Sequence, residues 1–207
     1  MDAETDRHAV PRARILDAAA AEFTACGFAG ARVDAIAARA GINKRLIYAY
    51  IGNKDAVWLA TLERVYARMR AQERALALDR LGPVEGMRVL VRFNFRFHAE
   101  HPEFIVMLND ENMQRARHVA RSTRVREMYS PLLALIADLL RRGAAEGAFR
   151  SGVDPMQLYI SIAALSYFYI ANRHTLSAIF DRDLGAADAM LVREQEAVDT
   201  ILGYLRP

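Results

Sequence analysis

Residues 32–57, RVDAIAARAGINKRLIYAYIGNKDAV, decide the fold of the N-terminal part of the chain. The apolar residues at positions 33, 36, 37 and 40 follow the spacing of a helix with one buried face. Gly41 stands where a helix commonly ends in a left-handed residue. Asn43 can cap a second short helix over residues 44–50, with Ile47 and Ile51 on its buried edge. Two short helices joined by a glycine turn make a helix-turn-helix.

The remaining faces of this motif are polar. Lys44, Arg45, Tyr48 and Tyr50 lie on or near the solvent side of the second helix, and Lys54 follows in the next element. Cationic and phenolic donors on one small surface suit phosphate oxygens and base edges. An ordinary helical hairpin with a solvated, charged face has the same spacing, so spacing alone leaves both interpretations open.

The segment from Arg32 to Lys54 resembles the DNA-binding domain of the TetR family of transcriptional regulators. The resemblance rests on a preceding helix that ends in Gly27-Phe28 and on Ile36-Ala37, Ala40-Gly41-Ile42, Ile47-Tyr48, Tyr50 and Lys54-Asp55. Two residues depart from the family pattern. Arg32 replaces the usual Thr or Ser, so a capping hydroxyl is lost while a cation that can reach phosphate remains. Ile51 replaces the usual Phe, which exchanges one buried apolar residue for another.

The resemblance implies a homodimer that binds a palindromic operator and is released by a small-molecule effector. Lys44, Arg45 and Leu46 are the best candidates for reading bases, although Leu46 also suits a core position. Arg32, Tyr48, Tyr50 and Lys54 should mainly hold phosphates. The complete set of expected DNA-binding residues is Arg32, Asn43, Lys44, Arg45, Leu46, Tyr48, Tyr50 and Lys54.

The composition fits a soluble, cytoplasmic protein. The chain has 207 residues, is 53% hydrophobic and carries a formal net charge of +3. The basic excess lies in residues 7–54, whereas residues 55–207 nearly balance. Cys26 is the only cysteine, so no intrachain disulfide is expected, and it is in phase with Phe23 as a small buried residue. The acidic N-terminus does not resemble a signal peptide, and the apolar stretch 156–170 is too short to span a membrane.

The rest of the chain predicts an all-α protein of about nine helices. Beyond the motif, helices are expected over about residues 11–26, 53–78, 83–100, 103–118, around 130–145, 155–176 and 187–205. The expected domains are a flexible tail (1–9), a three-helix DNA-binding domain (10–54) and a larger helical domain for effector binding and dimerisation (55–207).

The larger domain has two expected roles. Its last two helices have an apolar surplus, and the resemblance implies that they pair with a second copy of the chain in a four-helix bundle. Several polar residues interrupt apolar faces and must find partners, which are either a ligand or other core groups. The expected effector-pocket residues are Asn94, Phe97, Met107, Asn109, Asn112, Phe168, Asn172 and His174.

Other classes of function find less support in the sequence. No cofactor is expected, because the chain has no glycine-rich phosphate loop, nucleophile elbow or cysteine cluster. His98 and His101, with Glu111 or His118, do not form a tight metal motif, so no metal is expected. The alternatives kept open are a helical small-molecule binding protein and a helical-bundle enzyme, neither of which would bind specific DNA sequences.

Overall fold

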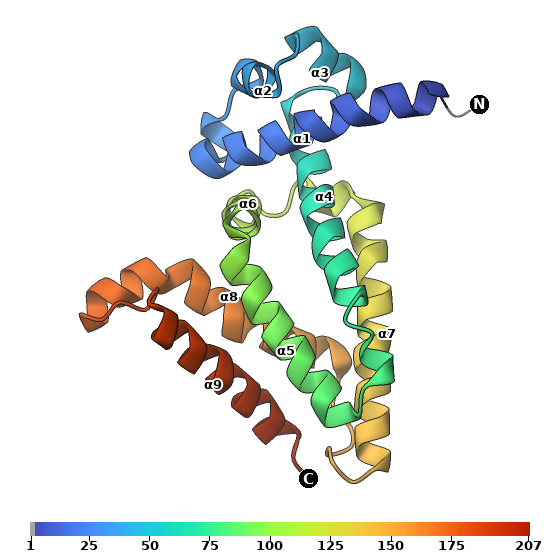
Figure 1. Ribbon diagram of the computed structural model, residues 1–207, viewed down its shortest axis with the longest axis vertical. Coiled ribbons are helices and arrows are strands. Elements are labelled where there is room, and N and C mark those ends of the chain that lie inside the picture. The colour runs from blue at the N-terminus through green and yellow to red at the C-terminus, as the bar shows by residue number, and fades with distance from the viewer. Residues whose placement is uncertain (1–2) are drawn as a thin grey trace. The chain divides into compact units, whose positions relative to one another are not determined.

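The computed structural model describes residues 3–207, with side chains from residue 12 onward, and this part of the chain is built from helices alone (Figure 1). The predicted all-α class is therefore confirmed. The nine α-helices of the described residues are α1 (Ala3–Gly30), α2 (Val33–Ala40), α3 (Lys44–Tyr50), α4 (Lys54–Arg74), α5 (Pro83–Glu100), α6 (Pro102–Met113), α7 (Thr123–Ala145), α8 (Pro155–Phe180) and α9 (Ala187–Leu205). Two short 3₁₀ turns, Leu78–Arg80 and Val119–Arg121, complete them. Within the described part, no helix is long and apolar enough to cross a membrane.

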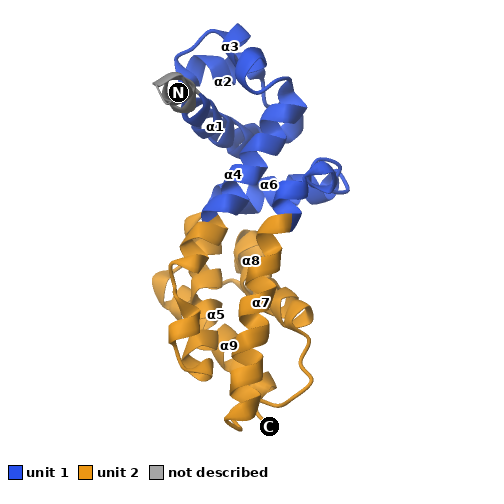
Figure 2. Cartoon of the chain, turned by 90° about the vertical axis from the view of Figure 1, so that its right-hand side faces the viewer, with its two compact units in different colours: residues 1–68, 102–126 blue, residues 69–101, 127–207 orange. Residues whose placement is uncertain are grey.

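The chain folds into two compact units (Figure 2). Unit 1 contains the residues up to 68 together with 102–126, and unit 2 contains 69–101 and 127–207. The compact unit that holds the helix-turn-helix thus also includes α6, which packs against α1. The expected domain limits at residues 54 and 55 stay a prediction. Of the expected tail, residues 1 and 2 lie outside the described residues, and α1 is drawn from Ala3.

The core of unit 1 is aromatic at its centre. Phe23, Ile36, Ile47 and Trp58 are fully buried, and the rings of Phe23 and Trp58 meet edge to face with centroids 4.7 Å apart. Aromatic pairs of this geometry stabilise a core beyond their buried area.

Cys26 is exposed, so its expected burial was wrong. The buried stripe of α1 runs through Ile15, Ala19 and Phe23 at four-residue spacing, and its next position is Gly27. Gly27 leaves helical geometry, with φ 66° and ψ 176°, so the stripe ends there and Cys26 stays on its solvent-facing flank.

Unit 2 has a separate apolar core. Pro83 occupies the first turn of α5, where its missing N–H costs nothing, and the Asp154 carboxylate caps α8 by accepting from two backbone N–H groups. The buried stripes of these helices and of α7 and α9 meet in one cluster. Its fully or almost fully buried members include Met87, Leu90, Ile136, Leu139, Ile162, Val198, Ile201 and Leu205.

Some predicted helix ends were wrong. α4 ends at Arg74 instead of near residue 78, because Ala77 adopts a left-handed conformation and Leu78 turns into the core of unit 2. α6 ends at Met113 instead of near residue 118. There the backbone bends so that His118 and Val119 donate their N–H groups back to the Glu111 carboxylate. Pro131 lies inside α7 and does not start a helix, and α8 continues to Phe180.

Candidate nucleic-acid interface

The helix-turn-helix has the local structure that its sequence predicts. Gly41 is left-handed, with φ 64° and ψ 38°, and its N–H bonds to the carbonyls of Ala37 and Ala38. Asn43 caps α3, because its side-chain oxygen accepts from the backbone N–H of Arg45 at 2.8 Å. Ile47 is fully buried. The capped turn therefore fixes the direction in which α3 leaves α2, and with it the exposed face of α3.

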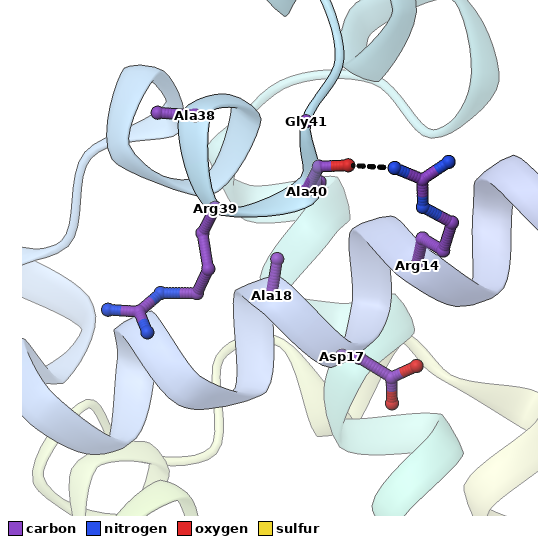
Figure 3. A pocket seen from close by; sticks show the side chains of 7 residues that line it. All are labelled: Arg14, Asp17, Ala18, Ala38, Arg39, Ala40 and Gly41. Atoms are coloured by element: carbon purple, nitrogen blue, oxygen red, sulfur yellow. Dashed lines mark hydrogen bonds between the residues drawn. The ribbon is translucent and has the colours of Figure 1, made fainter.

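α1 contacts and stabilises the turn between α2 and α3. Arg14 donates from Nη2 to the carbonyl oxygen of Ala40 at 2.7 Å, as Figure 3 shows. This bond satisfies one of the carbonyls left without a partner at the end of α2. The same residues line a hollow of about 450 Å³ between α1 and the turn, and Arg39 on its other side lies 3.8 Å from Glu22. The hollow is open and polar, which fits a solvated surface of the motif.

The structure brings most of the expected DNA-binding residues to the surface of the motif. Leu46 is 39% exposed and Tyr48 is 48% exposed, so Leu46 is available for contact and is not a core residue of this chain. Tyr50 is half-buried. Arg32, Asn43 and Arg45 are exposed as well.

Lys44 already has a partner. Its Nζ lies 2.8 Å from Asp34 Oδ1 on the preceding helix, and both side chains face solvent. The hydrogen bond with Asp34 raises the pKa of Lys44 above its ordinary value, and burial opposes this rise without cancelling it. Lys44 is therefore cationic, but an acid is next to it on the same surface.

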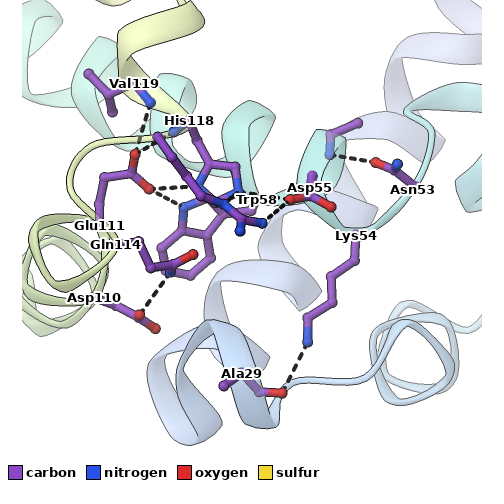
Figure 4. A network of polar contacts seen from close by, with 12 residues as sticks. Ala29, Asn53, Lys54, Asp55, Trp58, Asp110, Glu111, Gln114, His118 and Val119 are labelled. Atoms are coloured by element: carbon purple, nitrogen blue, oxygen red, sulfur yellow. Dashed lines mark hydrogen bonds and ion pairs between the residues drawn. The ribbon is translucent and has the colours of Figure 1, made fainter.

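Lys54 is held against the end of α1. Its Nζ donates to the carbonyl oxygen of Ala29 at 3.2 Å and lies 4.8 Å from the centroid of the Phe28 ring (Figure 4). Asn53 caps α4 by accepting from the N–H of Ala56 at 3.0 Å. The junction between the motif and α4 is thus fixed by named contacts within unit 1.

A polar network at this junction was not predicted from the sequence (Figure 4). His118 lies between two carboxylates, with Nε2 3.0 Å from Asp55 Oδ1 and Nδ1 2.8 Å from Glu111 Oε2. Hydrogen bonds from His118 and then Arg117 lower the pKa of Asp55. These residues are distant in sequence and follow no local pattern. In the sequence, only the expected break between α6 and α7 indicated that the chain could return to the start of α4.

The expected effector-pocket residues are divided between the two units. Asn94 and Phe97 are buried in unit 2, whereas Met107 is buried in unit 1. On α6, the side chains of Asn109 and Asn112 are exposed. On α8, Phe168 is 59% exposed, His174 is exposed, and Asn172 donates to the carbonyl of Phe168. Asn94 and Phe97 alone among the eight are therefore buried together in one unit.

A cluster of buried polar groups surrounds Asn94 in unit 2. Ser166 donates to Asn94 Oδ1 at 2.7 Å and lies 2.9 Å from His98 Nδ1, while Asn94 Nδ2 has no hydrogen-bond partner among the described atoms. Burial, and then the charge of Arg70, lower the pKa of His98 to about 4. Burial raises the pKa of Glu73, which lies 3.0 Å from Arg70, to about 7. The sequence pointed to Asn94 but not to Arg70 and Glu73. Both are charged residues on a long helix, where charged side chains ordinarily face solvent.

Metal ligation finds no support in the described residues, where no group of three or more His, Cys, Asp or Glu side chains is placed to hold an ion. His98 and His101 belong to unit 2, whereas Glu111 and His118 belong to unit 1.

The last two helices expose large apolar side chains. α8 and α9 line a hollow of about 560 Å³ that includes Leu165, Phe168, Ile201 and Tyr204. The large apolar side chains exposed on these two helices are Met156, Ile160, Phe168, Ile179, Phe180, Leu191, Val192 and Tyr204. Large apolar side chains exposed on two neighbouring helices are typical of a contact site.

Family models match most of the chain. The model described as "Bacterial regulatory proteins, tetR family" matches residues 15–61, and the model described as "Tetracyclin repressor-like, C-terminal domain" matches residues 83–201. The first match contains the whole helix-turn-helix, and the second runs from the start of α5 into α9.

Characterised relatives and solved structures agree with these matches. The chain is 35% identical over 178 residues to the HTH-type transcriptional repressor NicS of Pseudomonas putida, covering 86% of this chain and 84% of that protein. It is 32% identical over 157 residues to the repressor SCO4008 of Streptomyces coelicolor, covering 75% and 77%. Its fold is similar to that of the ketosteroid regulator KstR2 of Mycobacterium tuberculosis, with a TM-score of 0.67, 23% identity and 95% of each chain covered. FadR of Bacillus subtilis, solved with stearoyl-CoA, gives a TM-score of 0.64 at 15% identity, covering 93% of this chain and 98% of that one.

Proposed function

The chain belongs to the TetR family of bacterial regulatory proteins, and from this we propose that it is a transcriptional repressor that binds its operator as a homodimer and is released by a small-molecule effector. A regulator of transcription acts where the chromosome is, so we assign the protein to the cytoplasm. We assign it no catalytic step.

The exposed face of α3 is the observation that carries the proposal. Its N-terminus is capped by Asn43 and its buried edge is fixed by Ile47, so Lys44, Arg45 and Leu46 face solvent in the first turn. In helix-turn-helix proteins the N-terminal residues of the second helix contact base edges in the major groove. Asn43 itself acts on α3 as a cap, and its contribution to DNA binding is to hold these three residues in place.

The phosphate contacts fall to the residues around this face. Arg32, Tyr48 and Tyr50 offer guanidinium and phenolic donors, and Lys54 offers an ammonium group at the start of α4. Lys54 must exchange the Ala29 carbonyl for a phosphate or share its donors between them, which three N–H groups permit. Contacts of this kind set the position of the protein on the duplex without reading sequence.

The two-fold nature of an operator and the exposed surface of α8 and α9 support a dimer. One helix-turn-helix covers one half-site, and two half-sites lie about 34–36 Å apart on one face of a duplex. The apolar side chains exposed on α8 and α9 supply the surface that a second copy would cover. We therefore place the dimer contact on these two helices.

The buried polar cluster of unit 2 supports an effector site. Buried donors without partners cost free energy unless a ligand or water satisfies them, and Asn94 Nδ2 is such a donor. An effector that binds one spacing of the two DNA-binding units better than the other shifts the population toward it. The size of this shift is limited by the difference between its two affinities.

DNA binding measured by fluorescence anisotropy tests the proposal. The protein should bind the DNA upstream of its own gene more tightly than a scrambled duplex of the same length. The variant Lys54→Met keeps the aliphatic stem over Phe28 but loses the charge, so binding to every duplex should weaken and the salt slope should fall by about one unit for each bound protomer. Replacing Arg45 with Ala should instead change the preferred sequence. A protein that binds no duplex at low salt would contradict the proposal.

A further inference from the structure

A second basic surface lies in the same compact unit as the helix-turn-helix. Five arginines stand at positions 115, 117, 121, 124 and 126, with no acidic residue between Glu111 and Glu127. We call residues 115–126 the arginine segment. We propose that this segment is a second contact of unit 1 with the DNA backbone, holding phosphates that flank the half-site read by α3. This inference rests on the proposed function, because it adds contacts to the same DNA.

The arginine segment faces solvent and keeps most of its charge. All five arginine side chains are exposed. Arg117 pairs with Asp55, and Arg124 lies 3.7 Å from Glu63. Arg115, Arg121 and Arg126 form no ion pair with any residue of the described chain. At least three guanidinium groups are therefore uncompensated on one short stretch, which gives a local potential that attracts a polyanion.

The backbone of the segment is held in place from inside unit 1. Glu111 is almost fully buried and accepts the N–H groups of His118 and Val119 at 2.8 and 2.9 Å. Arg115 and Ala116 take left-handed conformations, with φ of 58° and 57°, which allows the chain to turn sharply after α6. The arginines thus extend from a fixed turn and not from a loose loop, so less conformational entropy is lost when they bind.

The segment lies beside the start of α4. Arg121 and His118 line a hollow of about 450 Å³ together with Asn53, Asp55 and Ala56. Asn53 and Asp55 are the neighbours of Lys54, which is expected to contact a phosphate. Asp55 also lines this hollow, and its carboxylate is already paired with Arg117 and hydrogen-bonded to His118. Arg121 therefore lines the same hollow as the two residues that flank Lys54, at the start of α4.

Arginine is a residue type well suited to phosphate. A guanidinium group presents several N–H donors in a planar fork that matches two phosphate oxygens, and it stays charged at any physiological pH. A duplex offers phosphates at regular short intervals, so neighbouring arginines on one segment can each meet one. The segment would meet the duplex through exposed charged side chains, so the energy should be mainly electrostatic and depend strongly on salt.

The test compares two double variants that lose the same net charge. Arg115→Gln with Arg121→Gln removes two charges from the segment without breaking an ion pair of the described chain. Arg80→Gln with Arg206→Gln removes two exposed charges from unit 2. Affinity for a duplex of mixed sequence is measured over a range of salt concentrations for the wild type and for both variants. Circular dichroism melting checks that each remains folded.

The segment variant should bind more weakly, and its salt slope should fall by about 0.9 for each phosphate that a protomer no longer neutralises. The unit 2 variant should keep the wild-type slope, and Arg115→Lys with Arg121→Lys should keep most of it because the charge remains. Equal slopes for the segment variant and the wild type would overturn the inference while leaving the proposed function intact. A wild-type protein that binds no duplex at all would overturn both.

Discussion

Trp58 donates its indole N–H to the carboxylate of Glu111, with 2.8 Å between Nε1 and Oε2, and both side chains are almost fully buried. The bond joins α4 to α6 inside unit 1. Glu111 also accepts two backbone N–H groups from the turn after α6. Burial alone raises the pKa of Glu111, but the bonds from Val119, Trp58 and His118 outweigh it and the net pKa is lowered. One ionised carboxylate thus connects α4, α6 and the arginine segment.

Replacing Glu111 with Gln should destabilise the protein by about 3 kcal/mol, because a neutral amide cannot accept from all of these buried donors. Trp58 is the only tryptophan, so urea unfolding followed by its fluorescence reports directly on this contact. The exposed Glu146→Gln serves as the control. A loss no larger than that of an ordinary surface substitution, about 0.5 kcal/mol, would show that the carboxylate is not needed.

Glu73 should make stability depend on pH in an unusual direction. Burial raises its pKa from 4.5 to about 7, so between these values the folded chain holds a proton that the unfolded chain releases. Its contribution is therefore complete below about pH 4.5 and is lost as the pH rises to 7. Arg70 and Arg74 oppose the shift. The stability of the wild type relative to Glu73→Gln should fall by roughly 2–3 kcal/mol over this interval. Urea unfolding at a series of pH values measures it, and a constant difference would contradict it.

His98 should make stability depend on pH in the direction opposite to Glu73. Its pKa is lowered from 6.5 to about 4 by burial and by Arg70, so the unfolded chain binds the proton first. The wild type should therefore lose stability relative to His98→Gln as the pH falls from 6.5 to 4. Because the windows of His98 and Glu73 overlap, the two effects partly cancel in the wild type and separate only in the variants.

Capping and turn residues, which act within a few positions, predicted the helix-turn-helix and the start of α5. A left-handed glycine, an asparagine cap and a proline in the first turn each act within a few residues, so Gly41, Asn43 and Pro83 could be read from the sequence. The end of α6 could not be predicted in this way, because the chain there bends around Glu111, whose carboxylate also bonds to Trp58, far away in sequence. Cys26 was misplaced because helical phase was continued up to a glycine that breaks it.

The candidate interface was predictable only in part, for the same reason. The residues of α3 follow one another on a single short helix, so their shared surface follows from spacing. The arginine segment is dense in charge, and its composition was visible in the sequence. What the sequence could not show is that α6 packs against α1, which places the segment in the compact unit of the motif. Over residues 55–207 as a whole the charges nearly balance, so the net charge of that range did not reveal the basic segment.

Replacing Asp34 with Asn should tighten DNA binding. Lys44 Nζ lies 2.8 Å from Asp34 Oδ1, so the carboxylate pairs with the ammonium group and also repels phosphates that approach α3. Without it, the raised pKa of Lys44 returns toward its ordinary value, where lysine is still cationic at neutral pH. If the freed ammonium group also meets a phosphate beside the bases it reads, the salt slope steepens by about 0.9 for each protomer. Salt titrations of binding measure this, with Asp79→Asn in unit 2 as a control for net charge. Unchanged binding would show that the ion pair with Asp34 does not weaken the contact of Lys44 with DNA.

Replacing Phe168 with Glu should break the dimer. Phe168 is 59% exposed on α8 and lines the hollow that α8 shares with α9, so in a dimer built on these helices a carboxylate would replace an apolar contact. Burial of a charge costs several kcal/mol unless a well-placed partner compensates it, and Arg193, which also lines the hollow, already donates to the carbonyl of Leu165. Sedimentation equilibrium should show a monomer, and operator binding should weaken because two half-sites are no longer held together. Met113 is 85% exposed on α6, so Met113→Glu is the matched control and should remain dimeric. If both variants sediment as the same dimer, the contact between the copies lies elsewhere than around Phe168.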